Sequence, residues 1–395
     1  MRVLHVHRIA GIGGSERHLL ALLPALARRG VEPFFLGLDT ADGAGEPFYR
    51  ELEAAGVPAF RLPAARDLDP ALARRLVASF RGLRPHLVHT HLVHADVYGA
   101  AAAARLRLPL VSSKHNDDRF RLGPFRHVER AATLAARGVI AITHALARFC
   151  VERVGLPAEK VEVVHYGLDR LPVAWGPNPG VDLPREARVL LAISRLTEQK
   201  GLGTAVEALP GIRAEHPGAV LVVLGEGPLR EPLRERAKAL GVADALLLPG
   251  RAGDIVPWLE RAEVFVHPAR WEGFGLVLLE AMLARLPIVA SRVSSIPEIV
   301  RDGETGDLVP PGDAGAFAAA VRRTLREPEL GRRQGEAGLA RARAHFSETR
   351  MAEHTLSVYE RAMRARPARR PERGAGGGTS AGSVLAPPRR DRTAR

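Results

Sequence analysis

The amino-acid sequence predicts an α/β protein built from two doubly wound, Rossmann-like domains. Short apolar runs alternate with helical patterns from residue 2 onward, and the same alternation starts again near residue 187. Between these halves, residues 171–186 are rich in proline and glycine and have no periodicity, which is typical of a linker. The chain has 395 residues, of which 46% are hydrophobic, so each half can bury a core of its own.

The first half opens with a β-α-β unit. A strand at residues 3–6 leads through a glycine-rich turn at residues 11–16 into a helix at residues 16–29 and a second strand at residues 33–38. Parallel strands joined in this way need a right-handed crossover. The other elements expected before residue 170 are helices at residues 49–55 and 70–81 and strands at residues 87–89, 110–112 and 139–143.

The second half repeats the alternation after the linker. Its expected strands lie at residues 189–193, 220–224, 246–248, 264–266 and 287–290, and its expected helices at residues 203–213, 228–240 and 256–261. We therefore expect one domain over residues 1–170 and a second over residues 187–345. The basic segment 366–395 lacks the apolar content of a core, and we expect it to be disordered.

The chain is strongly basic, with 57 Lys and Arg against 44 Asp and Glu and a net charge of +13. Such a charge suits nucleic acid, an anionic membrane surface or an anionic substrate. No helix-turn-helix, aromatic RNA-binding or OB pattern accompanies it, so we expect no nucleic-acid partner, although a non-catalytic nucleic-acid-binding protein remains an alternative. No apolar run approaches the roughly 20 residues that span a bilayer, the first residues lack a signal-peptide pattern, and Cys150 is the single cysteine. Together these features predict a cytoplasmic location.

Residues 264–283 carry the strongest functional pattern. An apolar run gives way to a turn containing Gly273 and Gly275 and then to a leucine-rich helix. Such a junction directs unpaired N–H groups and the positive end of the helix dipole at one place, so phosphate is the expected ligand. Glu272 lies in the turn and Glu280 in the helix, and carboxylates accept hydrogen bonds from vicinal diols. A phosphate flanked by hydroxyl-bearing groups predicts a nucleotide sugar.

Glu272 and Glu280, with seven residues between them, resemble the E-x7-E signature of family 4 glycosyltransferases. Residues 193–201 (ISRLTEQKG) are similar to the family's R-L-x-x-x-K-G element, and residues 225–228 (GEGP) match its G-x-G-P turn. The resemblance extends over nearly all of the chain that we expect to be ordered. It implies the GT-B architecture, in which two Rossmann-like domains face each other across a cleft and a C-terminal helix, here residues 346–365, crosses back to the first domain.

The resemblance also implies the reaction, which is retaining transfer of a sugar from a nucleotide-diphosphate donor to a hydroxyl of a glycan or lipid-linked acceptor. No metal and no cofactor are implied, and glycan, glycolipid or cell-envelope polysaccharide synthesis is the expected setting. Arg195 and Lys200 would bind the diphosphate and stabilise the departing nucleotide. Glu280 would hold the ribose diol, Glu272 would orient the sugar hydroxyls, and His115 would lie close to the donor sugar. The remaining donor-binding positions are Gly13, Gly14, Gly225, Gly227, Arg251, Phe274, Gly275 and Leu276.

Several patterns admit other interpretations. Gly11 and Gly13 begin a dinucleotide-binding G-x-G pattern, but Glu16 stands where the third glycine belongs, which argues against NAD. The runs at residues 89–91 (HTH) and 94–96 (HAD) have no metal-ligand spacing, so we expect no metal there. Residues 67–69 (DLD) imitate the D-x-D motif of a different glycosyltransferase fold, but before proline they predict a helix start. Within the same GT-B fold, a sugar-nucleotide epimerase is the alternative enzyme.

Three further segments bear on the acceptor side and on local structure. Ser294 or Ser295 with Glu298 predicts a helix N-cap and capping box. Residues 165–169 (HYGLD) replace the family's common P-N-G-[VI]-D wording, which leaves a donor contact from Tyr166 open. Residues 119–137 mix Arg, Phe and His, and predict either an ordinary solvated helix or a contact with an anionic membrane or lipid-linked acceptor. The second interpretation would place the protein peripherally on the inner membrane face.

Overall fold

The computed structural model describes residues 1–365 apart from residues 10, 41–42, 65–68, 118–122, 124, 173, 175–177 and 181–182. Residues Met1–Arg364 form one unit, which contains both sheets. The predicted tail at residues 366–395, part of the predicted linker, and Asp67 lie outside the described residues. The domain boundaries at residues 170 and 187 stay predictions.

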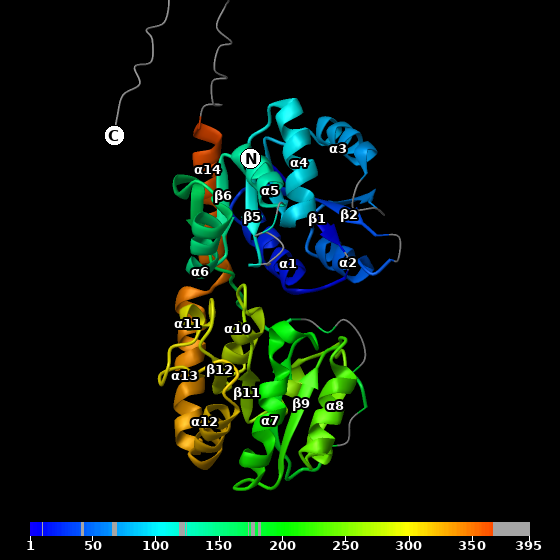
Figure 1. The fold of residues 1–395 in the computed structure, drawn as a ribbon. Helices are drawn as coiled ribbons and strands as arrows, with labels where there is room; N and C mark the ends of the chain where they lie inside the picture. The colour runs from blue at the N-terminus through cyan, green and yellow to red at the C-terminus, as the bar shows by residue number, and fades with distance from the viewer. Residues whose placement is uncertain are drawn as a thin grey trace, which may run out of the picture. The chain divides into compact units, whose positions relative to one another are not determined.

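The first sheet has seven parallel strands in the described residues, in the order β3-β2-β1-β4-β5-β6-β7. Figure 1 labels β1, β2, β5 and β6 of this sheet. In β1, Val3, Leu4 and Val6 are fully buried, as expected for a parallel strand covered by helices on both faces. The strand order reverses between β1 and β4, and ligands bind at the carboxyl ends of such strands. The strands are β1 Arg2–Ile9, β2 Glu32–Asp39, β3 Ala59–Pro63, β4 Leu87–His91, β5 Leu110–Lys114, β6 Gly138–Ala141 and β7 Val161–Val163.

The second sheet repeats this design with six parallel strands in the described residues, in the order β10-β9-β8-β11-β12-β13. Each strand predicted from the sequence overlaps a strand of one of the two sheets. The second sheet's strands are β8 Arg188–Ile193, β9 Ala219–Leu224, β10 Leu246–Gly250, β11 Val264–His267, β12 Ile288–Ser291 and β13 Asp307–Val309.

Helices connect the strands in both halves, as the alternating pattern predicts. Asp69 caps α3 by accepting hydrogen bonds from the N–H groups of Ala71 at 2.9 Å and Leu72 at 3.3 Å, which confirms the predicted helix start. The helices around the first sheet are α1 Gly14–Ala27, α2 Glu46–Ala54, α3 Pro70–Leu83, α4 Leu92–Leu106, α5 Phe125–Leu134 and α6 His144–Arg148. Those around the second sheet are α7 Leu202–Arg213, α8 Arg230–Ala239, α9 Val256–Arg261, α10 Leu276–Leu283, α11 Ile296–Ile299 and α12 Ala314–Arg326.

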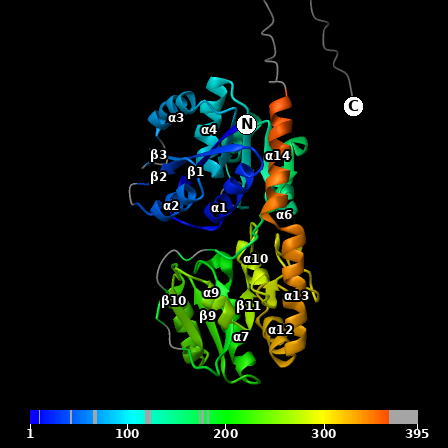
Figure 2. The ribbon, with the colours of Figure 1, turned by 180° about the vertical axis from the view of Figure 1, so that it is seen from behind.

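The last two helices link the two sheets. α13 Pro328–His345 packs against α10 in the second half, and α14 Glu348–Arg364 packs against α1, β5 and β6 in the first half (Figure 2). Met351, Val358 and Tyr359 are buried along α14, so the helix presents an apolar face to the first sheet. This arrangement confirms the predicted helix that returns to the first domain.

Candidate functional site

The carboxyl edge of the second sheet carries most of the predicted donor-binding residues. Arg195 follows β8, and Gly225 follows β9. The backbone at Gly225 has a φ of 147° and lies so close to the Ser194 carbonyl group that a side chain there would collide with it. Glycine therefore lets these two turns pack directly together. The same edge carries Gly227 after β9 and the exposed Arg251 after β10.

Lys200, which is half-buried, forms an ion pair with the buried Glu272 at this edge. Lys200 Nζ lies 2.5 Å from Glu272 Oε2, and His267 Nε2 lies 3.0 Å from the same oxygen. Burial alone would raise the pKa of Glu272, but the charge of Lys200 and the hydrogen bond from His267 outweigh it and hold that pKa well below its usual range. Glu272 is therefore ionised at neutral pH.

Arg195 is tied to the same turn through Gln199. The Arg195 guanidinium donates to Gln199 Oε1 at 3.1 Å, and Gln199 Nε2 donates to the carbonyl oxygen of Trp271 at 3.3 Å. The N–H of Arg270 donates in return to the carbonyl oxygen of Gln199 at 2.8 Å. Because Trp271 directly precedes Glu272, these bonds fix the loop of Arg195 against the turn that leads into α10.

Glu280 lies inside α10 and is fully buried. Its Oε1 accepts a hydrogen bond from the guanidinium of Arg17, which comes from α1 in the first half. Its Oε2 has no hydrogen-bond partner among the described residues. A buried polar atom without a partner costs about 1–3 kcal/mol. This carboxylate oxygen is therefore well suited to accept a hydrogen bond from a ligand hydroxyl.

α10 begins at a glycine in the left-handed conformation. Gly275 is its N-cap with a φ of 85°, a conformation that strains residues with a side chain. No side chain caps this helix, and its first turn holds no acidic residue. Leu276 is its first residue, and the nearby carboxylate of Glu272, three residues before Gly275, is paired with Lys200 rather than with the first N–H groups of the helix. Phe274 is buried, with its ring 4.8 Å from that of Tyr166, which leaves its backbone as the part available to a ligand.

The glycine turn of the first half is occupied by its own helix. The N–H of Gly13 donates to Glu16 Oε2 at 2.9 Å, while Glu16 Oε1 lies 2.9 Å from His7 Nε2. Burial alone would raise the pKa of Glu16, but the hydrogen bond and charge of His7 hold it below its usual value. The predicted anion-binding amide of Gly13 thus has a partner already, and Gly14 is the exposed first residue of α1.

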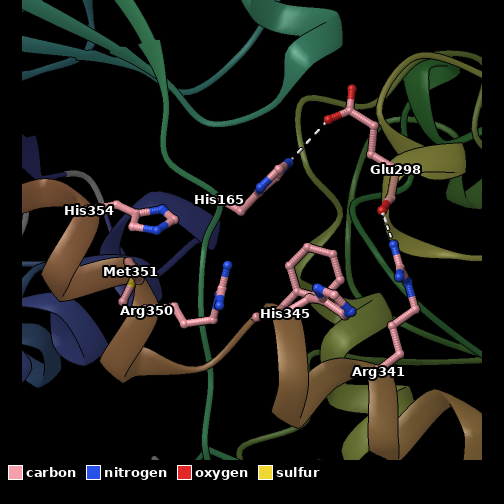
Figure 3. A pocket seen from close by; sticks show the side chains of 8 residues that line it. His165, Glu298, Arg341, His345, Arg350, Met351 and His354 are labelled. Carbon is pink, nitrogen blue, oxygen red and sulfur yellow. Dashed lines mark hydrogen bonds and ion pairs between the residues drawn. The ribbon is translucent and has the colours of Figure 1, made fainter.

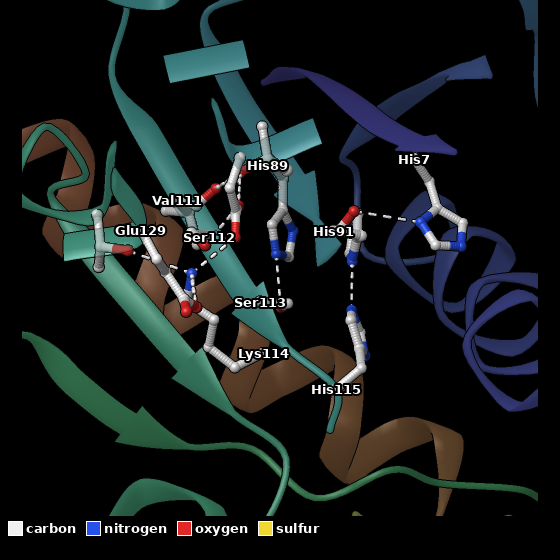
Figure 4. A network of polar contacts seen from close by, with 12 residues as sticks. His7, His89, His91, Val111, Ser112, Ser113, Lys114, His115 and Glu129 are labelled. Atoms are coloured by element: carbon white, nitrogen blue, oxygen red, sulfur yellow. Dashed lines mark hydrogen bonds and ion pairs between the residues drawn. The ribbon is translucent and has the colours of Figure 1, made fainter. Parts of the chain in front are cut away.

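His115 directly follows β5, and both of its ring nitrogens are engaged. Nε2 lies 3.0 Å from His91 Nδ1 (Figure 4), and Nδ1 is hydrogen-bonded to the hydroxyl of Tyr166. A hydrogen bond from this imidazole to a donor sugar therefore requires one of these two contacts to be replaced. The contact between Tyr166 and Phe274 explains why an aromatic residue occupies position 166, and it assigns Tyr166 a packing role between the two halves.

A chain of buried histidines continues inward from His115. The parallel register sets His5 beside His89 and His7 beside His91 on β1 and β4. His91 Nε2 lies 3.0 Å from His5 Nδ1, so the hydrogen bonds run from His115 through His91 to His5. The signal in the sequence is the repeated H-x-H spacing in two predicted strands, which puts both histidines of each strand on one face.

Three of these histidines, His5, His89 and His91, are neutral. Burial lowers the pKa of His5 to about 3 and lowers those of His89 and His91 well below the usual value. One ring nitrogen of each comes within 4.8 Å of the others, a grouping that the sequence does not predict and that a metal ion could bridge. His89 Nδ1 instead lies 2.6 Å from the hydroxyl of Tyr359, so hydrogen bonds satisfy this cluster.

Glu298 does not complete a capping box, and that prediction is wrong. Its carboxylate accepts hydrogen bonds from the N–H groups of His144 at 2.8 Å and Ala145 at 2.7 Å, and it lies 3.2 Å from His165 Nε2. Ser295 is the N-cap of α11, but its hydroxyl donates to backbone carbonyl oxygens of the turn before α10. The positive end of the α6 helix dipole attracts the Glu298 carboxylate, although the two lie far apart in the sequence.

No sequence motif singles out Arg17 or His267, although both contact predicted site residues. His267 is the last residue of β11, so its place at the carboxyl edge directly before Glu272 was a usable signal. Arg17 offered none, because its partner Glu280 lies 263 positions away.

Family models match both halves of the chain. The model described as Glycosyl transferases group 1 matches residues 179–341, and the model described as Glycosyltransferase Family 4 matches residues 12–170. The first match contains the whole edge from Arg195 to Glu280, and the second contains Gly13, Arg17 and His115.

Several known proteins are similar over most of the chain. The glycogen synthase of Mycobacterium tuberculosis is 31% identical over 301 residues, which cover 72% of this chain and 70% of that protein. The GDP-mannose-dependent alpha-(1-6)-phosphatidylinositol monomannoside mannosyltransferase of Mycolicibacterium smegmatis is 29% identical over 371 residues, 82% of this chain and 89% of that protein. The crystal structure of Anabaena Alr3699/HepE in complex with UDP-glucose matches with a TM-score of 0.75 and 22% identity, over 91% of this chain and 99% of that one. This structural match confirms the expected GT-B fold.

Proposed function

Since the chain belongs to the family 4, group 1 glycosyltransferases and uses a nucleotide sugar, we propose that it is a retaining enzyme with its donor site at the start of α10. The observation that carries this proposal is the buried Glu280 Oε2 without a partner, on the helix that follows the Lys200–Glu272 pair. The ribose diol donates to Glu280, the diphosphate lies against the uncapped start of α10, and Glu272 orients the sugar hydroxyls.

Lys200 and Arg195 supply the positive charge for the diphosphate. Both lie in the loop that follows β8, and the hydrogen bonds of Gln199 fix that loop. During transfer the bond between the sugar C1 and the phosphate oxygen breaks, and the two cations stabilise the charge that develops on the leaving diphosphate. The acceptor hydroxyl attacks C1 from the same face and its proton passes to the leaving phosphate oxygen, so the configuration at C1 is retained. No protein nucleophile is assigned.

The donor base is open between uracil, guanine and adenine. The Mycolicibacterium relative carries GDP-mannose in its name, whereas the Anabaena protein is bound to UDP-glucose. Arg251 meets the base mainly through its backbone in this proposal, which leaves no mark of the base on the side-chain sequence. A thermal-shift screen with UDP, GDP and ADP identifies it.

The acceptor in this proposal is a glycan or a lipid-linked hydroxyl at an anionic membrane surface. Among the described residues, no helix is long and apolar enough to cross a membrane. α5 exposes 45% of Val128 and 47% of Leu134, and its Arg130 is also exposed. Apolar and cationic side chains together suit shallow contact with anionic lipid.

Vesicle co-sedimentation tests this membrane contact. We expect binding to vesicles that contain phosphatidylglycerol and a clear loss of binding in the Val128→Asp/Leu134→Asp variant. Met363→Asp is the matched control, because Met363 is 40% exposed on another helix. Equal sedimentation of both variants would remove the membrane from the proposal.

The reaction itself is tested by incubating the protein with UDP-, GDP- and ADP-sugars, with and without a panel of glycan and lipid acceptors. The expected product keeps the α configuration of the donor, as read from the anomeric proton by NMR. A product with inverted configuration contradicts the retaining mechanism. A change in the donor sugar without any acceptor would favour the epimerase alternative.

A further inference from the structure

A cationic cavity of about 210 Å³ lies at the junction of α13 and α14 and shares no residue with the donor site. At about 30 Å³ per molecule of liquid water, it has room for a ligand the size of several waters. Its lining joins both halves of the chain, because it includes α11, the two last helices and the segment after β7. The polar side chains that line it are His165, Glu298, Arg341, His345, Arg350 and His354.

The basic side chains come from both helices (Figure 3). Arg341 and His345 project from α13, Arg350 and His354 project from α14, and His165 lies between the two groups. Arg341 donates to the carbonyl oxygens of Glu298 and Ile299, each at 2.7 Å. These bonds hold the guanidinium in place without neutralising its charge.

Glu298, the carboxylate in the cavity lining, is engaged by groups other than the two arginines. Glu298 already accepts two N–H groups of α6 in addition to His165. In the described part of the chain, neither Arg341 nor Arg350 forms an ion pair with a carboxylate. Burial and the repulsion of Arg341 and Arg350 lower the pKa of His345, which is the effect of a positive field. An anion in the cavity would be attracted by this field.

We propose that this cavity binds a small phosphomonoester dianion. Guanidinium groups present paired N–H donors that match phosphate oxygens. The imidazoles of the lining histidines add further hydrogen-bonding groups around the same space. The volume suits a phosphate group with a small substituent. Because α13 packs on α10 and α14 packs on α1, the bound dianion bridges the helices that join the two sheets. It therefore favours one relative position of the two domains.

Isothermal titration calorimetry with inorganic phosphate, and in a second arm with a hexose 6-phosphate, tests the site at constant ionic strength. Arg350→Gln should weaken binding at least about tenfold, because one charge-assisted bidentate pair is lost. Arg343→Gln is the control, since Arg343 is exposed near the end of α13, the helix that carries Arg341 and His345, and does not line the cavity. Tighter binding in the second arm would identify a phosphorylated sugar as the source of the phosphate group.

Two outcomes would overturn the proposal: equal binding by Arg350→Gln and Arg343→Gln, or loss of phosphate binding in Lys200→Ala, which would move the phosphate to the donor site. The Arg350→Gln variant should bind the donor nucleotide as tightly as the wild type does. Nucleotide binding that is lost in Lys200→Ala but kept in Arg350→Gln would support the proposed donor site, whatever the outcome for phosphate binding in the cavity.

Discussion

Two junctions in this molecule share one design, a strand followed by a glycine turn and a helix, and they differ in where the carboxylate lies. At β1 and α1, Glu16 lies inside the helix and turns back to bind the N–H of Gly13 at 2.9 Å. At β11 and α10, Glu272 precedes the helix and is held by Lys200 at 2.5 Å. The first helix start is therefore occupied by its own sequence, and the second has no side-chain cap.

A glycine turn alone therefore does not leave a helix start open to phosphate. A carboxylate three residues into the helix neutralises the positive helix end, as a capping box does. The same carboxylate placed before the helix and paired with a lysine leaves that end available. We therefore expect substitutions at the second junction to lower turnover with the donor far more than substitutions at the first junction do.

The largest expected effect comes from removing the charged groups of the second junction. Lys200→Ala and Glu280→Ala should each lower turnover at least about 100-fold, on the scale of losing one electrostatic partner of the transition state. Steady-state kinetics measures this effect, and circular dichroism checks the fold. Lys238→Ala, an exposed lysine on α8, is the control. Near-wild-type rates in both variants would reject the assignment of the site.

The pH dependence of stability tests the buried histidines of β1 and α1 at the first junction. His5 and His18 are buried and neutral, with pKa values lowered to about 3 by burial, against 6.5 for an ordinary histidine. Between these values the unfolded chain binds more protons than the folded one, so stability is lost as the pH falls below about 6.5. At pH 5 each such histidine lowers the free energy of unfolding by about 2 kcal/mol relative to pH 7.5.

His18→Phe isolates one of these contributions. The ring of His18 stacks on Tyr166 at 4.1 Å, and its Nδ1 has no hydrogen-bond partner among the described residues, so phenylalanine keeps the stack and removes the titration. Urea unfolding should show the variant clearly more stable than the wild type at pH 5, with a smaller difference at pH 7.5. If the variant and the wild type differed in stability by the same amount at both pH values, the claim that His18 stays neutral in the folded protein at pH 5 would be contradicted.

Arg17→Gln tests the contact that links the junctions. This change leaves the buried carboxylate of Glu280 without its cation, and a buried carboxylate without a partner is strongly disfavoured. We expect kcat/KM for the donor to fall about tenfold, mainly because KM rises. An unchanged KM would show that Arg17 does not prepare Glu280 for the ribose.

Glu16→Gln should have the smallest effect on catalysis. Glutamine can still accept the hydrogen bond from the N–H of Gly13, so the change removes the charge beside the helix start and its pairing with His7, together worth roughly 1 kcal/mol of stability. We expect kcat/KM to stay within about threefold of the wild type while the melting temperature falls slightly. A loss as large as that of Lys200→Ala would erase the contrast between the junctions.

The regular elements could be predicted because their signals are local. β11 and α10 follow from an apolar run, two glycines and a leucine-rich helix within twenty residues of sequence. The sequence pattern does not predict the short strands β3, β7 and β13, which lie at the edges of the sheets and have only five, three and three residues. Edge strands of this length carry too few alternating positions to show a period.

The pairings within the site could be predicted only in part. The association of Lys200 with Glu272 follows from two motifs that both end strands of one sheet. By contrast, the partners of Glu298 and Glu280 come from the other half of the chain. Because that distance hides the true partner, the sequence around Glu298 indicates only a local cap. Local spacing cannot distinguish a carboxylate that caps its own helix from one that caps a distant helix.

The most direct test of the donor site is calorimetric titration of UDP, GDP and ADP into the wild type, Glu280→Gln and Glu16→Gln. We predict that at least one nucleoside diphosphate binds the wild type and Glu16→Gln equally, and that Glu280→Gln weakens its binding by about tenfold or more. Absence of binding to the wild type, or equal weakening by the two variants, would contradict a ribose site at Glu280.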